Sequence, residues 1–345
     1  MKDIRSFTKD ELKAELAALD MKPFRAGQIF DWLHVKGATG FDEMTNLSLV
    51  DREKLAGEFD ASPLSIRDVQ ISSIDGTRKY LFLLHDGNMV ESVLMSYKHG
   101  YSVCISTQAG CRMGCRFCAS TLNGLARNLT AGEMLSQIYG IERHAGVRIS
   151  NIVTMGSGEP LDNYDELVKF IRLVSDPDGR NISQRNITVS TCGLVENMRR
   201  FADEGFAVTL AVSLHAPNDD IRRQTMPIAN AYSIDSVIDA CRYFFEKTGR
   251  RVSFEYSLIK GVNDSRQNAL ELAGRLKGLN CHVNLIPVNP VKERSYERSQ
   301  RSDIESFAKM LEKNGINATI RREMGRDIDG ACGQLRKRYL DSDTQ

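Results

Sequence analysis

The sequence contains no run of apolar residues long enough to cross a bilayer, although apolar residues make up 41% of its 345 positions. Its first residues, MKDIRSFTKDELKAEL, are polar and predict a helix, not a signal peptide. Low-complexity tracts and residue-level repeats are also absent. These absences argue against a membrane-spanning or disordered protein, and we expect a globular protein of the cytoplasm with no membrane contact.

A large net charge is also lacking. The 46 Lys and Arg residues against 45 Asp and Glu residues give a formal charge of +1 at pH 7. This balance argues against a protein that simply coats nucleic acid. Basic residues nevertheless gather in two segments, 292–301 and 321–338. Such clusters are more often solvated surface than phosphate-binding sites, so charge alone leaves both interpretations open.

The alternation of strand and helix patterns after residue 98 predicts an α/β fold. Six apolar, β-rich runs alternate there with amphipathic helical segments, which is typical of a parallel sheet covered by helices. Six units are too few for the closed barrel of eight strands, so we expect an open, partial (β/α)6 barrel of the TIM type. The expected strands are YSVCIST, NIVTMGS, NITVSTCG, AVTLAVSLHA, RVSFEYSLI and HVNLIPVN. The expected helices follow a capping box at Thr130 and Glu133 and begin near Tyr164, Leu194, Ser233 and Asp264.

Two smaller units precede the barrel. Residues 1–60 carry amphipathic helical patterns and predict a small helical accessory domain. Residues 61–97 contain the turn signals Asp75-Gly76 and Asp86-Gly87 between β-prone runs, so they predict a short β hairpin extension. We therefore expect a division into 1–60, 61–97 and a core of 98–345.

Small, polar and flexible residues follow several of the expected strands. In parallel α/β folds, functional sites lie at the C-terminal ends of the strands. Packing alone does not require such residues to meet at one rim, and the sequence therefore predicts a site there. The segments are 156–160, 190–193, 213–215 and 287–289, together with the loop after the first strand.

That loop reads CRMGCRFC and carries Cys111, Cys115 and Cys118 without a fourth cysteine. Clustered cysteines in a cytoplasmic protein indicate metal binding or catalysis more often than disulfides. A structural zinc site needs four ligands, and Cys104 or a distant histidine could complete one. A [4Fe–4S] cluster normally has four thiolate ligands, so three would leave one iron open for a substrate or cofactor. Both interpretations remain open on spacing alone.

The Cys-x3-Cys-x2-Cys spacing with six following βα units resembles the radical S-adenosylmethionine (SAM) superfamily. The resemblance implies a [4Fe–4S] cluster on the three cysteines, whose open iron chelates SAM and whose electron yields a 5′-deoxyadenosyl radical. It favours the cluster over zinc. Over nearly the whole chain the sequence is similar to the RlmN family, bacterial enzymes that methylate carbon 2 of an adenosine in 23S ribosomal RNA. The motifs occur in order as CISTQAGCRMGCRFCAS, NIVTMGSGEPLDN, TVSTCG, AVSLHAPN, RRQTMPI, VNLIPVN and DIDGACGQL.

The resemblance implies a mechanism that uses two SAM molecules per turnover. One methylates Cys332, the methyl carrier, and the other supplies the radical that removes a hydrogen from this methyl group. The resulting methylene radical joins the base, and Cys104 then resolves the adduct and leaves a disulfide bond. Glu91, flanked by apolar residues, corresponds to the proton acceptor. Without the resemblance, either cysteine would more often be buried and structural.

The resemblance also implies a set of SAM contacts at the strand ends. Gly158 and Glu159 correspond to the edge that holds the methionine ammonium. The other members of the set, which correspond to ribose, adenosine and far-edge contacts, are Ser190, Ser213, Leu214, His215 and Asn289. Any one of them alone could be a strand-end cap or a core residue.

The implied partners are 23S rRNA, transfer RNA for some members, and an electron donor such as flavodoxin or ferredoxin, with the chain acting as a monomer. A related branch, the Cfr type, methylates carbon 8 and confers antibiotic resistance. Pro160 favours carbon 2, because the carbon-8 branch tends to have alanine there. An alternative from another class is a zinc-stapled RNA-binding module without catalysis, which would need neither Cys332 nor Cys104.

Overall fold

The computed structural model describes residues 1–289, 296–328 and 333–342. Seven parallel strands form the main part of its sheet. They are β6 (Gly100–Cys104), β9 (Ile149–Thr154), β10 (Ile187–Thr191), β11 (Thr209–Ser213), β12 (Val252–Leu258), β13 (Cys281–Pro287) and β14 (Ala318–Ile320). The first six are the six predicted strands, so the partial (β/α)6 barrel is confirmed. The seventh, β14, was not predicted because three residues are too few to show a pattern.

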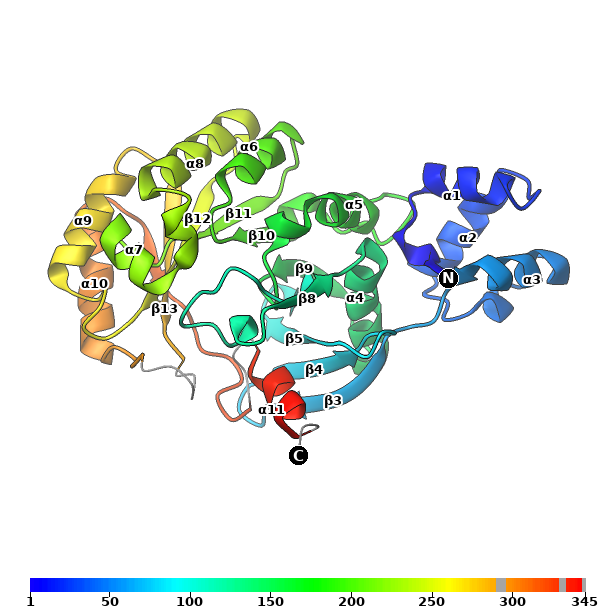
Figure 1. Cartoon of the computed structure of the whole chain (residues 1–345), viewed down its shortest axis with the longest axis horizontal. Coiled ribbons are helices and arrows are strands. Elements are labelled where there is room, and N and C mark those ends of the chain that lie inside the picture. Colours follow the sequence, from blue (N-terminus) through cyan, green and yellow to red (C-terminus); the bar gives the residue numbers. More distant parts are fainter. Residues whose placement is uncertain (290–295, 329–332, 343–345) are drawn as a thin grey trace.

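Helices cover the outer side of the curved parallel sheet (Figure 1). They bury apolar side chains against it, as Leu167 and Ile171 do. The predicted capping box is present, since the Thr130 hydroxyl accepts from the Glu133 amide and the Glu133 carboxylate accepts from the Thr130 amide. The helices are α4 (Ala131–Ala145), α5 (Tyr164–Val174), α6 (Val195–Asp203), α7 (Asp219–Thr225), α8 (Ile234–Thr248), α9 (Arg266–Leu276) and α10 (Arg301–Lys313). Among the described residues, no helix has the length and apolarity to span a membrane.

Three antiparallel strands extend the same sheet beyond β6. They are β3 (Ser65–Ile71), β4 (Arg78–Leu83) and β5 (Met89–Tyr97), and β5 pairs directly with β6. Gly76 and Gly87 have φ angles of 72° and 84°, as the two predicted turns require. The full order is β14-β13-β12-β11-β10-β9-β6-β5-β4-β3, so the extension is continuous with the barrel. The division of the chain at residues 60 and 97 stays a prediction.

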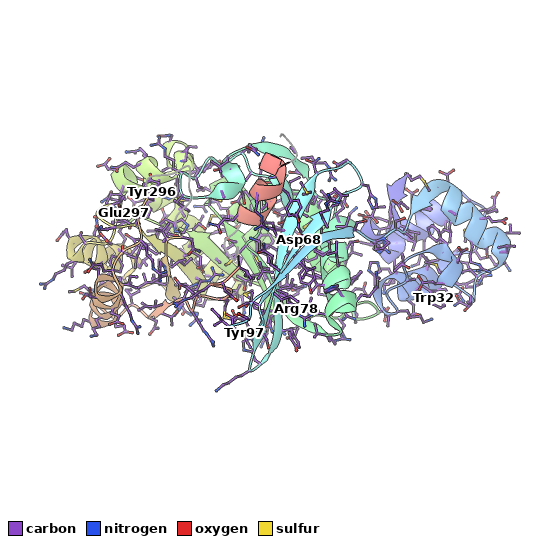
Figure 2. All side chains as sticks on the ribbon, turned by 90° about the horizontal axis from the view of Figure 1, so that it is seen from below. Trp32, Asp68, Arg78, Tyr97, Tyr296 and Glu297 are labelled. Carbon is purple, nitrogen blue, oxygen red and sulfur yellow. The ribbon has the colours of Figure 1, made fainter. Side chains whose placement is uncertain are left out.

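The N-terminal residues form a helical lobe at one end of the molecule (Figure 1). It contains α1 (Lys9–Ala17), α2 (Arg25–His34) and α3 (Leu49–Glu58), closed by pairing of β1 (Lys2–Asp3) with β2 (Phe59–Asp60). The lobe has its own apolar core. The helix predicted for the first residues begins only at Lys9, because Thr8 caps it and the preceding residues form β1 and a turn. Figure 2 shows Trp32 on this lobe, at the opposite end of the molecule from Tyr296.

His34 joins the lobe to the barrel and makes folding sensitive to acid. Its Nδ1 lies 2.9 Å from the Tyr139 hydroxyl of α4. Burial, with a smaller contribution from the nearby Arg5 charge, lowers the pKa of His34 to about 3. An unfolded histidine has a pKa of ~6.5, so below that pH the unfolded state binds the proton first and the free energy of unfolding falls. The loss from His34 is about 2 kcal/mol when the pH is lowered to ~5.

We therefore expect the melting temperature of His34→Gln to fall less steeply than that of the wild type as the pH is lowered from about 7 to 5. Circular dichroism melts at several pH values measure this slope. His99 is exposed, and His99→Gln is the matched control that should keep the wild-type slope. The same slope in all three proteins would contradict the assignment.

Candidate active site

The cysteine loop, residues 111–118, is held from both sides. It follows β7 (Gln108–Gly110), which pairs with β8 (Leu125–Asn128). Gly110 has a φ of 89°, and a Cβ there would clash with the Gly124 carbonyl oxygen, so glycine is required. The Cys111 amide donates to the Gly124 carbonyl at 2.9 Å, and the Arg116 amide donates to the Thr225 carbonyl at the end of α7 at 2.8 Å. The loop is therefore fixed by backbone contacts.

The three predicted ligands, Cys111, Cys115 and Cys118, line one cavity of about 260 Å³, which we call the cluster cavity. Desolvation raises the pKa of Cys111 to about 12 and that of Cys115 well above its usual range, and the nearby Cys118 adds to both shifts. Such thiols become thiolates only beside strong positive charge, which an iron core supplies.

Across the described ranges, no three His, Cys, Asp or Glu side chains converge closely enough to hold a single metal ion. This finding gives no support to a zinc site within those ranges. A [4Fe–4S] cluster is larger than one ion and can be bound by thiolates that stand further apart. The three thiols on one cavity therefore fit a cluster.

Glu159 is buried beside these thiols. Its carboxylate accepts the amide hydrogens of Cys192 at 2.7 Å and Leu161 at 3.1 Å. Burial raises the pKa of Glu159, and the Cys192 amide opposes this shift. Gly158 has a φ of 111°, and a Cβ there would lie 2.6 Å from the Gln108 Cβ, so only glycine permits this approach. A buried carboxylate in this position can receive an ammonium group.

The structure brings six of the seven predicted SAM contacts to the cluster cavity, and Leu214 is the exception. Leu214 is fully buried in the core, and its amide donates to the Glu255 carbonyl at 3.1 Å. A hydrophobic side chain after an apolar strand packs inward, and this explains the difference. The six that line the cavity are Gly158, Glu159, Ser190, Ser213, His215 and Asn289.

His215 is neutral in the cluster cavity. Burial, with a smaller contribution from Arg222, lowers the pKa of His215 to about 3. Its Nδ1 accepts the Ser257 amide hydrogen at 2.9 Å, so the ring proton lies on Nε2. The ring also contacts Phe117 of the cysteine loop, with centroids 4.8 Å apart. His215 can thus donate a hydrogen bond without bringing positive charge.

Sequence reasoning missed several residues that line the cluster cavity, including Glu255, Ser257 and Met226. Glu255 could have been found, because a carboxylate interrupts an otherwise apolar strand in RVSFEYSLI. Cys192 also lines this cavity, as its strand-end position suggested. No disulfide bond joins any two of the seven described cysteines. Cys332 lies outside the described residues.

Cys104 lines a second cavity of about 640 Å³, which we call the basic cavity. Arg298, Arg321, Arg322 and Arg326 also line it, so part of each basic segment meets at this place. The two cavities share Met155, Ile286, Asn289 and Arg321 as lining residues. A polyanion that enters the basic cavity would therefore come next to the cluster cavity.

Glu91 lies on β5, is buried, and lines neither cavity. Its Oε1 accepts the Arg336 amide at 2.6 Å, and its Oε2 accepts the Gly333 amide at 2.6 Å. The buried Lys79 ammonium lies 3.0 Å from the same Oε2. The carboxylate thus caps the N-terminal end of α11 (Gln334–Ser342), which packs against β5 and the turn Ala119–Thr121. Through these contacts Glu91 anchors the N-terminal end of α11 to β5.

A partial barrel of parallel strands whose first loop carries three thiols over a cavity is the architecture of the radical SAM enzymes. The model of the radical SAM superfamily matches residues 105–273, and the model of the ribosomal RNA large subunit methyltransferase N-terminal domain matches residues 2–60. The class expected from the sequence is thereby confirmed.

Similar proteins identify the family to which the chain belongs within the radical SAM superfamily. Over 339 residues the chain is 62% identical to a probable dual-specificity RNA methyltransferase RlmN of Lachnoclostridium phytofermentans, covering 98% of this chain and 95% of that protein. It is 60% identical to the protein so named in Lachnospira eligens, covering 99% and 97%. The crystal structure of a radical SAM methyltransferase from Sphaerobacter thermophilus matches with a TM-score of 0.92 at 46% identity, covering 97% and 99%. The chain belongs to the RlmN family and is an RNA methyltransferase of the radical SAM class.

Proposed function

We propose that this enzyme methylates carbon 2 of an adenosine in 23S rRNA and in transfer RNA. The observation that carries the proposal is the wall of Met155, Ile286, Asn289 and Arg321 shared by the two cavities. A base that enters past the basic rim would meet the products of SAM cleavage at this wall. The term "dual-specificity" in the names of the relatives supports two kinds of RNA substrate.

In this proposal Cys111, Cys115 and Cys118 hold a [4Fe–4S] cluster. When bound, the cluster supplies the electron that splits SAM into methionine and a 5′-deoxyadenosyl radical. Glu159 receives the SAM ammonium, since its carboxylate is buried at the edge of the cluster cavity. The neutral His215 adds no repulsion toward the positive sulfonium of SAM.

Carbon 2 of adenine is electrophilic and does not attack the methyl group of SAM, so the methyl group must travel on a carrier. We propose that the Cys332 sulfur takes a methyl group from one SAM by displacement and that the radical from a second SAM removes a hydrogen from it. The methylene radical adds to carbon 2, and the adduct then loses one electron, for which the oxidised cluster would be the acceptor, together with the carbon-2 proton. The Cys104 thiolate then attacks the Cys332 sulfur, forming a disulfide bond and breaking the sulfur–carbon bond to the RNA, and the released carbon takes up a proton to become the methyl group.

The residue that follows the carrier lies near the cysteine loop. The Gly333 amide is bound by Glu91, and a Cβ at position 333 would lie 2.7 Å from the Ser120 nitrogen, just after the cysteine loop. We propose Glu91 as the acceptor of the carbon-2 proton. Because both of its oxygens hold amide hydrogens, the adduct must displace one of these donors before the proton can transfer.

We propose that the enzyme acts as a cytoplasmic monomer and receives electrons from a flavodoxin or ferredoxin. Pro160, at the start of the 3-10 turn Pro160–Asn163, supports carbon 2 over carbon 8. A zinc-stapled RNA-binding module would not need a buried carboxylate at position 159.

Expression in a host that lacks its own enzyme tests the function. Mass spectrometry of 23S rRNA and transfer RNA should find 2-methyladenosine in both, and Cys115→Ala should give none. The carbon-8 isomer, 8-methyladenosine, would support the alternative branch. Unmethylated RNA in the presence of wild-type protein that cleaves SAM would overturn the proposal.

Arg322 offers a separate test of the basic cavity, because it lines this cavity only, whereas Arg321 lines both. We expect Arg322→Ala to weaken RNA binding and to reduce the slope of log affinity against log salt by about one phosphate contact. SAM cleavage without RNA should be unchanged in Arg322→Ala and impaired in Arg321→Ala. Fluorescence anisotropy over a salt series measures the slope. Arg301 on α10 is exposed, and Arg301→Ala is the control. Equal slopes for the wild type, Arg322→Ala and Arg301→Ala would exclude a phosphate contact of Arg322.

A further inference from the structure

Arg222 on α7 is fully buried, and it is the largest side chain of which this is true among the described residues. Among the residues that the structure describes, its guanidinium donates only to backbone carbonyls, to Cys192 at 2.6 Å and to Tyr232 at 3.3 Å, and its Nε has no hydrogen-bond partner there. Within residues 1–289, 296–328 and 333–342, no Asp or Glu forms an ion pair with it. A buried cation without a carboxylate partner is costly, so a further negative group is expected beside it.

The surroundings of Arg222 identify that negative group. The Cys192 carbonyl that Arg222 binds belongs to a residue that lines the cluster cavity together with Cys115, a predicted cluster ligand. Three residues further on, the Thr225 carbonyl binds the Arg116 amide of the cysteine loop at 2.8 Å. A Cβ at position 114 of the same loop would contact Pro227, just after α7, at 3.4 Å. The end of α7 therefore lies against the cysteine loop, and the Arg222 guanidinium lies against the lining of the cluster cavity at Cys192.

We propose that Arg222 is a fixed countercharge for the cluster and raises its reduction potential. This rests on the proposed [4Fe–4S] cluster. Three thiolates make the loaded site negative, and reduction transfers one electron from the flavodoxin or ferredoxin donor to it without moving a proton. The guanidinium stays protonated throughout, and its attraction to the site grows when the electron arrives. Arg222 is thus a positioning residue that favours the reduced state.

The alternative role is a purely mechanical one, in which Arg222 only ties the Cys192 carbonyl to α7. Charge and hydrogen bonding are separated by substitution. Arg222→Gln keeps a donor and loses the charge, Arg222→Met fills similar space without either, and Arg222→Lys keeps the charge with fewer donors. The neighbouring Arg223 is half exposed and pairs with Asp220, so Arg223→Gln is the matched control.

The test is a redox titration of each reconstituted protein, without SAM or RNA, followed by electron paramagnetic resonance. We expect Arg222→Gln and Arg222→Met to disfavour reduction by at least tenfold, a shift of ~59 mV to more negative potential for one electron. Arg222→Lys and Arg223→Gln should stay near the wild type. A wild-type potential in Arg222→Gln, or an equal shift in Arg222→Lys, would overturn the proposal.

Two further outcomes are also decisive. If neither Arg222→Gln nor Arg222→Met assembles a cluster, the result for Arg222→Lys decides the question. This variant must then assemble a cluster with the wild-type reduction potential. If it does not assemble one, or if its potential differs, Arg222 is not a countercharge. A wild-type protein that binds no [4Fe–4S] cluster would instead overturn the proposed function. Iron content and absorbance of the wild type therefore separate failure of the function from failure of the role of Arg222.

Discussion

Replacing Cys104 with alanine is expected to leave the enzyme covalently joined to its RNA, with no detectable release of methylated product. The adduct still forms because methylation of Cys332 and radical addition do not need Cys104. It persists because no thiolate is available to attack the carrier sulfur. Cys332→Ala should give neither adduct nor product, because the methyl group has no carrier. Denaturing gels with labelled RNA show the adduct, and mass spectrometry of Cys104→Ala shows the modified Cys332 peptide.

Cys281 provides the matched control for this experiment. It is a buried free thiol at the start of β13 and lines neither cavity. Cys281→Ala should therefore release methylated RNA as the wild type does. Free methylated RNA from Cys332→Ala would exclude the carrier role, and rapid release from Cys104→Ala would exclude the resolving role.

The parts of the site that could be predicted from the sequence are those set by local pattern. The spacing within CRMGCRFC fixes three thiols on one loop, and strand order places the strand-end residues at one rim. Leu214 shows the limit of this reasoning, because a motif position does not tell whether a side chain faces the cavity or the core. The fold was predictable for the same reason, since its six predicted parallel strands lie in apolar, β-rich runs of the sequence.

Contacts between distant segments could not be predicted. The sequence DDIRRQT is polar and suggests an exposed helix, yet Arg222 within it is fully buried and donates to the Cys192 carbonyl. Glu91 was predicted as a lone carboxylate near the base, and its bonds to Gly333 and Arg336 span 242 and 245 residues. Periodicity reports which face of an element is apolar, and it carries no information about which polar partner meets it.

The variants Glu91→Ala and Glu91→Gln are expected to block the reaction at two different steps. Glu91→Ala removes the acceptor of the Gly333 and Arg336 amides and the carboxylate that faces Lys79. Breaking a buried ion pair in this way costs about 3–5 kcal/mol, so we expect a lower melting temperature and release of α11 from β5. Without that anchor, methylation of Cys332 should itself be lost.

Glu91→Gln keeps an oxygen that can accept one amide hydrogen, so α11 should stay anchored and Cys332 should still be methylated. An amide cannot take the carbon-2 proton, and we therefore expect the protein–RNA adduct to form and to resolve slowly. Peptide mass spectrometry reports methylation of Cys332, and denaturing gels report the adduct. The double variant Lys79→Met/Glu91→Gln removes the buried ammonium as well and should melt closer to the wild type. Normal release from Glu91→Gln would leave Glu91 as an anchor alone, and the proton acceptor would have to lie elsewhere.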